Sequence, residues 1–200
     1  FDAFIRNNGL EYVLTTEMTD EEILSEFVSS TLPYKLREAL KAYVRTVSGP
    51  LAVRSSSKLE DSHYQPFAGI YSTYMIPYTE GNEDRQLRLL QKAIKSVYAS
   101  TYFAASKAYV QSSQNLIAEE KMAVVIQEVC GTEQDGLFFP TLSGVARSIN
   151  YYPIGDEMPE EGVCNIALGL GKLVVDGGRT LRFSPRYPQK VLQTSTPELA

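Results

Sequence analysis

The sequence predicts an α+β fold in which helices come first and antiparallel strands follow, with a further helix among the strands. Apolar residues recur at helical spacing before residue 50 and again over residues 83–117. Short apolar runs bounded by Gly, Pro and Ser fill much of 51–78 and 122–183, as strands do. A chain of 200 residues can bury a substantial core, either in one large domain or in two small lobes.

Two helices are predicted near the start of the chain. The first begins at Thr19, whose hydroxyl stands three residues before Glu22 in a capping-box pattern, and it ends near Ser30. The second has Pro33 in its first turn and Gly49 as its C-terminal stop, because Pro is favoured at helix starts and Gly just after helix ends.

Strands and one helical region are predicted in the middle of the chain. A strand at LAV (51–53) leads into a polar loop, and a second strand covers 67–78 with a close backbone approach at Gly69. Residues 83–117 predict one long helix or two helices in sequence. MAVVIQEV (122–129) predicts a continuous buried strand.

The last third of the chain is rich in turn residues. A strand over 138–153 is predicted to break at Ser143-Gly144, and two short strands over 174–183 are predicted to meet at a Gly-Gly turn. The GLGK segment at 169–172 matches neither a Walker A loop nor a GxGxxG motif, so we expect a turn there.

Composition and charge exclude several functional classes. The formal charge of −5 argues against a nucleic-acid binder, since contact with the phosphate backbone needs a basic face. No apolar run is as long as the roughly 18 residues of a membrane span, so we expect no membrane partner. Two cysteines outside any CxxC motif predict a cytoplasmic protein without a zinc or redox site. The acidic run at 156–161 is expected to be a solvated loop rather than a metal site.

The residues best suited to chemistry lie in PLAVRSSS at 50–57. There a buried strand would deliver Arg54 together with three hydroxyl groups to its end. A guanidinium in that place can bind phosphate oxygens through a bidentate fork, although a lone arginine at a strand end is more commonly a salt-bridge partner.

Several separated segments together resemble a known family. They are AVRSSS, the acidic pair Glu60-Asp61, FAG, Thr73, the helix IKSVYASTYFAASKAYV, the strand MAVVIQEV, LSGVA and LGLGKLVVDGG. Their order and spacing are similar to the nucleotide-binding domain of phosphoenolpyruvate synthase and pyruvate phosphate dikinase, over about residues 1–183.

The resemblance implies an ATP-grasp-like fold, in which two lobes with mixed or antiparallel sheets and packed helices hold ATP between them. Residues 1–50 would be a helical segment leading into this nucleotide-binding domain, and 51–200 would be its core. The chain begins at Phe1 and stops at a polar STPELA, so we expect it to be a piece of a longer protein and the fold to be incomplete at both ends.

The resemblance also implies a nucleotide-binding role for six residues, which are Arg54, Gly69, Thr73, Gln127, Glu128 and Val129. Arg54 would contact the ATP phosphates, and Gly69 and Thr73 would belong to the loop and strand over the phosphates. Gln127, Glu128 and Val129 would lie beside adenine. The implied cofactors are ATP and Mg²⁺, and the implied partners are a carrier-histidine domain and a PEP/pyruvate domain of the same longer chain. No catalytic or metal-binding residue is assigned within residues 1–200, so the isolated fragment is expected to be inactive.

Departures from the family pattern leave three functions open. The two glutamines that usually follow FAG are Ile70 and Tyr71 here, and Arg147 stands where an apolar residue is more common. The first function is the ATP-binding portion of a phosphotransferase that passes phosphate from ATP to a carrier histidine. The second is a non-catalytic nucleotide-binding or assembly module, which these departures favour. The third is a related dikinase with a different acceptor.

Overall fold

The computed structural model describes residues 1–57, 71–112, 121–175 and 178–191 of the chain. By its contacts the chain divides into two parts, Phe1–Val129 and Cys130–Ala200, which we call the N-terminal unit and the C-terminal unit. Helices and antiparallel sheets occur in the same chain, so the predicted α+β class is confirmed.

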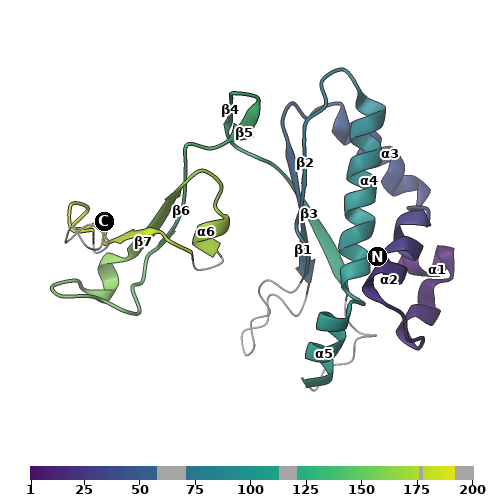
Figure 1. Ribbon diagram of the computed structural model, residues 1–200, viewed down its shortest axis with the longest axis horizontal. Coiled ribbons are helices and arrows are strands. Elements are labelled where there is room, and N and C mark those ends of the chain that lie inside the picture. Colours follow the sequence, from purple (N-terminus) through teal and green to yellow (C-terminus); the bar gives the residue numbers. More distant parts are fainter. Residues whose placement is uncertain (58–70, 113–120, 176–177, 192–200) are drawn as a thin grey trace. The chain divides into compact units, whose positions relative to one another are not determined.

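The N-terminal unit is a sheet covered by helices. Its elements, in chain order, are α1 (Asp2–Asn8), a 3-10 helix (Leu10–Leu14), α2 (Asp20–Ser29), α3 (Tyr34–Val44), β1 (Leu51–Ser57), β2 (Tyr74–Ile76), α4 (Glu83–Ser100), α5 (Ala104–Ser112) and β3 (Met122–Glu128). Helix α4 lies along the sheet, and α2 and α3 pack against α4 (Figure 1). The helices before residue 50 thus belong to the same unit as the strands after it, while the functional division predicted at residue 50 stays a prediction.

The predicted capping box is confirmed at the start of α2. The backbone N–H of Glu22 donates to Thr19 Oγ1 over 3.2 Å, and the backbone N–H of Thr19 donates to Glu22 Oε2 over 2.8 Å. Helix α3 ends at Val44 rather than at Gly49, so the predicted stop was wrong. Val47 lies after the end of the helix and is nevertheless buried, so the apolar pattern that predicted a longer helix continues into the loop.

The helical region predicted over 83–117 consists of two helices, α4 and α5, which is one of the two alternatives. Residues 113–117 lie outside the described part of the chain. Of the strand predicted over 67–78, Tyr74–Ile76 are confirmed as β2, and residues 67–70 are not among those described.

The sheet of the N-terminal unit has the order β2-β1-β3, and both pairs are antiparallel. Strand β1 continues to Ser57, which pairs with Met122, so the predicted loop after residue 53 was wrong. The predicted strand at 122–129 is confirmed as β3, but more and less exposed residues alternate along it. It is not continuously buried, because α4 covers only one face of this antiparallel sheet.

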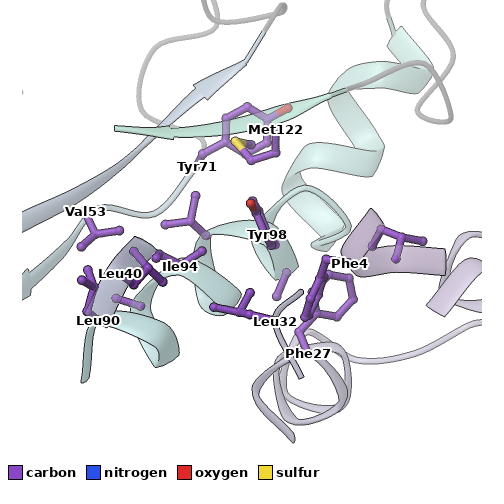
Figure 2. Close-up of a cluster of buried hydrophobic side chains, with 14 of the residues drawn as sticks. Phe4, Phe27, Leu32, Leu40, Val53, Tyr71, Leu90, Ile94, Tyr98 and Met122 are labelled. Carbon is purple, nitrogen blue, oxygen red and sulfur yellow. The ribbon is translucent and has the colours of Figure 1, made fainter. Parts of the chain in front are cut away.

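The core of the N-terminal unit lies between the sheet and the helices (Figure 2). The rings of Phe4 and Phe27 lie 5.8 Å apart between centroids, and those of Phe4 and Tyr98 lie 5.5 Å apart. Leu90 of α4 and Val53 of β1 are completely buried in the same cluster. Burial on this scale makes apolar packing the main stabilising contribution in this unit.

The C-terminal unit is built mainly from short strands. Its elements are β4 (Thr132–Gln134), β5 (Leu137–Phe139), β6 (Leu142–Arg147), a 3-10 helix (Pro159–Glu161), β7 (Val163–Leu168), α6 (Lys172–Val175) and β8 (Leu181–Phe183). Strands β4 and β5 form a hairpin, and β6, β7 and β8 form a second antiparallel sheet in that order. The hairpin turns at Asp135-Gly136, where both residues have positive φ, 51° and 78°, as a type I′ turn requires.

Two predictions for the C-terminal unit were wrong. Ser143 and Gly144 lie inside β6, and the interruption falls before them, where β5 ends at Phe139 and Pro140 has no N–H to continue a ladder. The segment KLVV at 172–175 is the short helix α6, not a strand, since periodicity cannot separate the two in so short an apolar run. The Gly-Gly turn predicted after it falls partly on residues 176–177, outside the described part.

The acidic run at 156–161 is not simply a solvated loop. Glu157, whose side chain is 11% exposed, accepts hydrogen bonds from both terminal nitrogens of Arg182 at 2.9 and 2.7 Å. It also accepts from the backbone N–H of Ile154 and from Asn150 Nδ2. The hydrogen bonds from Arg182, which outweigh the opposing effect of burial, lower the pKa of Glu157 from 4.5 to about 2. An ion pair thus ties the β6–β7 connection to β8.

Candidate functional site

One face of the N-terminal sheet is open to solvent, and it carries two of the predicted site residues. The register places on this face, which we call the outer face, Ala52, Arg54 and Ser56 of β1, Met75 of β2, and Ala123, Val125 and Gln127 of β3. Exposure follows the same alternation, since Leu51, Val53 and Ser57 of β1 are buried while Arg54 is exposed. The outer face is therefore the surface of this unit on which Arg54 and Gln127 come together.

Arg54 and Gln127 contact each other on the outer face. Arg54 Nη1 lies 3.5 Å from Gln127 Oε1, which is a long and weak hydrogen bond. Val125 stands opposite Arg54 in the β1–β3 ladder and is 39% exposed. A guanidinium, an amide and an apolar side chain thus lie together, and a charged guanidinium on a weak contact is available to bind an anion.

The sequence predicted Arg54 at the end of a strand. It lies instead in the middle of β1. Strand β1 is the central strand of the sheet, paired with β2 on one side and with β3 on the other. The three serines that follow Arg54 keep pairing with β3, because that strand supplies partners down to Met122. Arg54 is therefore exposed as predicted, but its side chain extends from the face of the sheet and not from the end of a strand.

Strand β3 has an edge that no described strand covers. The backbone N–H of Val129 donates to the carbonyl of Pro50 over 2.8 Å, and antiparallel pairing alternates from there along the strand. The backbone groups of Gln127 therefore face β1, and those of Ile126 and Glu128 face the open edge. A planar ligand at this edge would contact the backbone N–H and C=O groups of Ile126 and Glu128.

The side chain of Glu128 lies away from the outer face. Its Oε1 accepts hydrogen bonds from the backbone N–H of Ser48 at 3.2 Å and from Ser48 Oγ at 3.4 Å. Gly49 leaves room for this carboxylate, since a Cβ at position 49 would lie 2.8 Å from the same oxygen. Its negative charge contributes, after burial, to raising the pKa of Tyr43. The Glu128 carboxylate thus ties the α3–β1 turn to the end of β3.

The remaining predicted site residues are Thr73, Val129 and Gly69, and two of them are among the described residues. Thr73 is exposed directly before β2, and exposure alternates from it through Tyr74 and Met75, which puts Thr73 on the side of the outer face. Val129 is half-buried just after β3. Gly69 lies outside the described residues, so the structure does not locate it.

Tyr71 stands where the family more often has a glutamine, and it is only 6% exposed. It belongs to the buried cluster of the N-terminal unit together with Met122 (Figure 2). A side chain packed there does not extend from the outer face. This departure from the family pattern therefore serves the core.

The sequence pointed to Arg54 and Gln127 but missed two features of the site. One is the tie from Glu128 to Ser48, which depends on a contact between positions 80 residues apart. The other is the exposure of Val125, which no alternation in the sequence signals, because the first five residues of β3 are all apolar.

No group of three or more His, Cys, Asp or Glu side chains suited to a metal ion occurs among the described residues. Within the same residues, no helix combines the length and the apolar character needed to cross a membrane.

Comparison with known proteins identifies the class as a nucleotide-binding domain. Residues 2–194 match the family model described as "Pyruvate phosphate dikinase, AMP/ATP-binding domain". The chain belongs to this family, which confirms the resemblance inferred from the sequence.

Two curated proteins are similar to the chain. The "Uncharacterized phosphotransferase YvkC" of Bacillus subtilis (strain 168) is 34% identical over 160 residues, covering 80% of this chain and 16% of the relative. A "Phosphoenolpyruvate synthase" of Aeropyrum pernix is 30% identical over 169 residues, covering 80% of this chain and 18% of the relative. The chain thus spans less than a fifth of the length of these relatives.

Proposed function

We propose that this chain is the ATP-binding portion of a multidomain phosphotransferase with an ATP-grasp-like fold. The longer protein would pass a phosphoryl group from ATP to a carrier histidine in another of its domains, as in phosphoenolpyruvate synthase. The observation that carries the proposal is the outer face itself, where Arg54 and Gln127 meet beside the open edge of β3, within the residues that match the ATP-binding family.

In the proposed complex, each part of the outer face has its own task. Arg54 would bind phosphate oxygens through charge-assisted hydrogen bonds. Val125 would lie against the adenine ring, and the outward backbone groups of 126 and 128 would bind the polar edge of the ring. Gln127 would hold the Arg54 guanidinium before the nucleotide enters. Phosphoryl transfer depends mainly on positioning and on neutralising charge, and the chain would contribute to both.

Mg²⁺ is part of the prediction only through the resemblance. The described residues hold no carboxylate cluster that fits the ion, and Glu128, the acidic residue of β3, is occupied with Ser48. We therefore assign no residue to the metal and route no step through it.

The decisive experiment compares Arg54→Ala with wild-type full-length protein by calorimetric titration with ATP. Loss of a charge-assisted contact of about 1.5 to 3 kcal/mol should weaken ATP binding roughly 10- to 150-fold. Arg88→Ala is the matched control, because it removes an exposed arginine from the outside of the same unit. Equal ATP affinity of Arg54→Ala and wild type, with unchanged melting temperatures, would refute the site.

A second function is favoured by one observation. Tyr71 is packed in the core where the family more often has an amide side chain, so a phosphate contact that the resemblance would imply at this position is missing. The protein would then be a nucleotide-binding module without turnover. Tight ATP binding by the full-length protein, combined with no exchange of labelled phosphate between ATP and the protein, would select this alternative.

A further inference from the structure

The last residue of β3 takes part in two separate arrangements. The backbone N–H and C=O of Glu128 face the open edge of the strand, because the backbone of the next residue, Val129, faces β1. The carboxylate of Glu128 lies away from the outer face and accepts hydrogen bonds from the backbone N–H and the Oγ of Ser48, at 3.2 and 3.4 Å. One residue thus joins the proposed adenine edge to the turn between α3 and β1.

The ladder between β1 and β3 is weak at this end. The backbone N–H of Val129 donates to the carbonyl of Pro50 over 2.8 Å, but Pro50 has no N–H to give the second hydrogen bond that such a pair normally has. Among the described strands β3 pairs with β1 alone, so no second neighbour holds its end. Strand ends of this kind open locally more readily than the middle of a sheet. The hydrogen bonds from Ser48 to Glu128 therefore stabilise β3 where its ladder ends.

The turn between α3 and β1 has room for the Glu128 side chain. Gly49 is buried, and a Cβ at position 49 would lie 2.8 Å from Glu128 Oε1 and 3.3 Å from its Cγ. A larger residue at position 49 would push the carboxylate away from Ser48. Gly49→Ala therefore offers a way to disturb the contact without changing a residue of β3.

The position of β3 along its own axis matters for a base bound at the open edge. Backbone N–H and C=O groups alternate along such an edge. Adenine carries an N–H donor on N6, whereas guanine carries an acceptor, O6, at the matching ring position. A carbonyl that accepts from N6 of adenine would face O6 of guanine, and a shift of the strand by one backbone group would exchange the two preferences. A strand end that is held in place can therefore separate the two purines.

We infer that Glu128 is a positioning residue for the selection of ATP over GTP. Its carboxylate, held by Ser48, fixes the backbone of Ile126 and Glu128 so that the open edge matches adenine and not guanine. The inference rests on the proposed function, because it takes the open edge of β3 as the place where the base binds. The side chain of Glu128 acts on the nucleotide only through the main chain to which it belongs.

The test measures the dissociation constants of the full-length protein for ATP, GTP and inorganic tripolyphosphate by calorimetric titration. Glu128→Ala removes the acceptor for Ser48, so the ratio of the GTP constant to the ATP constant should fall about three- to tenfold. Glu128→Gln keeps an oxygen for Ser48 and should return the ratio to within about twofold of the wild-type value. Tripolyphosphate has no base, so its binding should be unchanged in both variants. Glu83→Ala is the matched control with an unchanged ratio, since it removes an exposed carboxylate that pairs with Arg45 in the same unit.

A second variant disturbs the same contact from the other side. Gly49→Ala should lower the ratio by displacing the carboxylate of Glu128. In the Glu128→Ala background the same change should alter the ratio by less than about twofold, because the displaced group is gone. Additive effects of the two substitutions would show that they act separately and would overturn the inference. Should Glu128→Ala lower the melting temperature, Gly49→Ala alone gives the reading, and an unchanged ratio overturns the inference.

The outcomes separate this inference from the proposed function. If the wild-type protein binds ATP, three results overturn the inference alone. They are no preference of the wild type for ATP over GTP, an unchanged ratio in Glu128→Ala, and an equal weakening of ATP, GTP and tripolyphosphate in that variant. A wild-type protein that does not bind ATP refutes the proposed function, and this inference falls with it.

Discussion

The two units of the molecule use their apolar residues in opposite ways. In the N-terminal unit the apolar side chains gather in one buried cluster, whereas Val163 and Ala167 are the buried apolar residues among those described in the C-terminal unit. Among the described residues, thirteen of the eighteen exposed large apolar side chains belong to the C-terminal unit, which is the shorter of the two. The N-terminal unit is therefore stabilised by packing, and the C-terminal unit depends more on turns, hydrogen bonds and the largely buried Arg182–Glu157 ion pair.

The largest expected effect tests the packed side of this comparison. Phe27→Ala removes a completely buried ring and should lower the free energy of unfolding by about 3 to 5 kcal/mol. Tyr152→Ala removes a ring that is 85% exposed, and it should change that free energy by less than about 0.5 kcal/mol. Denaturant titration of the full-length protein measures both. Similar losses for the two variants would show that the units do not differ as described.

The Arg182–Glu157 ion pair of the C-terminal unit gives the next largest effect. Glu157→Ala leaves the guanidinium of Arg182, only 16% exposed, without its carboxylate, and should cost about 2 to 3 kcal/mol. The cost lies below that of a fully buried pair because water still reaches Arg182. Glu160→Ala, an exposed change in the same loop, is the control. Hydrogen exchange at the Ile154 amide, which donates to Glu157, should accelerate only in Glu157→Ala.

The same pair predicts an acid-sensitive contribution in the C-terminal unit. Because the pKa of Glu157 is lowered to about 2, its carboxylate stabilises the fold fully above the ordinary value of 4.5. That stabilisation is lost as the pH falls from about 4.5 towards about 2. The difference in unfolding free energy between wild type and Glu157→Ala should shrink over this range, and a constant difference would contradict the assignment.

The smallest effects compare a helix cap with a hairpin turn. Thr19→Ala removes the capping box of α2 and should cost about 1 kcal/mol. Gly136→Ala places a Cβ on a residue with φ of 78° in the β4–β5 turn and should cost about 1 to 2 kcal/mol. Thermal unfolding gives the loss in melting temperature for each variant. If the C-terminal unit depends on its turns, the loss for Gly136→Ala should be at least as large as the loss for Thr19→Ala.

Sequence patterns predicted the packed unit better than the open one. The start of α2 and the strand β3 follow from Thr19, Glu22 and a run of apolar residues, all of them local signals. Strand β7 was not predicted, because its residues 163–168 alternate weakly and pair with strands on both sides. The hairpin at Asp135-Gly136 was also missed, because the strand before the DG pair is the polar TEQ and only the LFF after it is apolar.

The candidate site was predictable in part. Arg54 and Gln127 were singled out before their contact was known, and the structure brings them together. The orientation of Glu128 could not be foreseen, since it depends on Ser48 and on the space above Gly49. One residue of offset along a strand reverses the face, so neighbours as similar as Gln127 and Glu128 take opposite directions.

The central position of β1 has a consequence for Arg54. Its backbone is fixed by ladders on both sides before any ligand arrives, so the main chain at this point has no freedom left to lose. Under the proposed function, the conformational entropy that Arg54 itself loses on binding would come from the rotamers of its side chain, at most about 2 kcal/mol for an arginine. The sheet would thus fix the position of the Arg54 backbone at the folding step, before ATP binds.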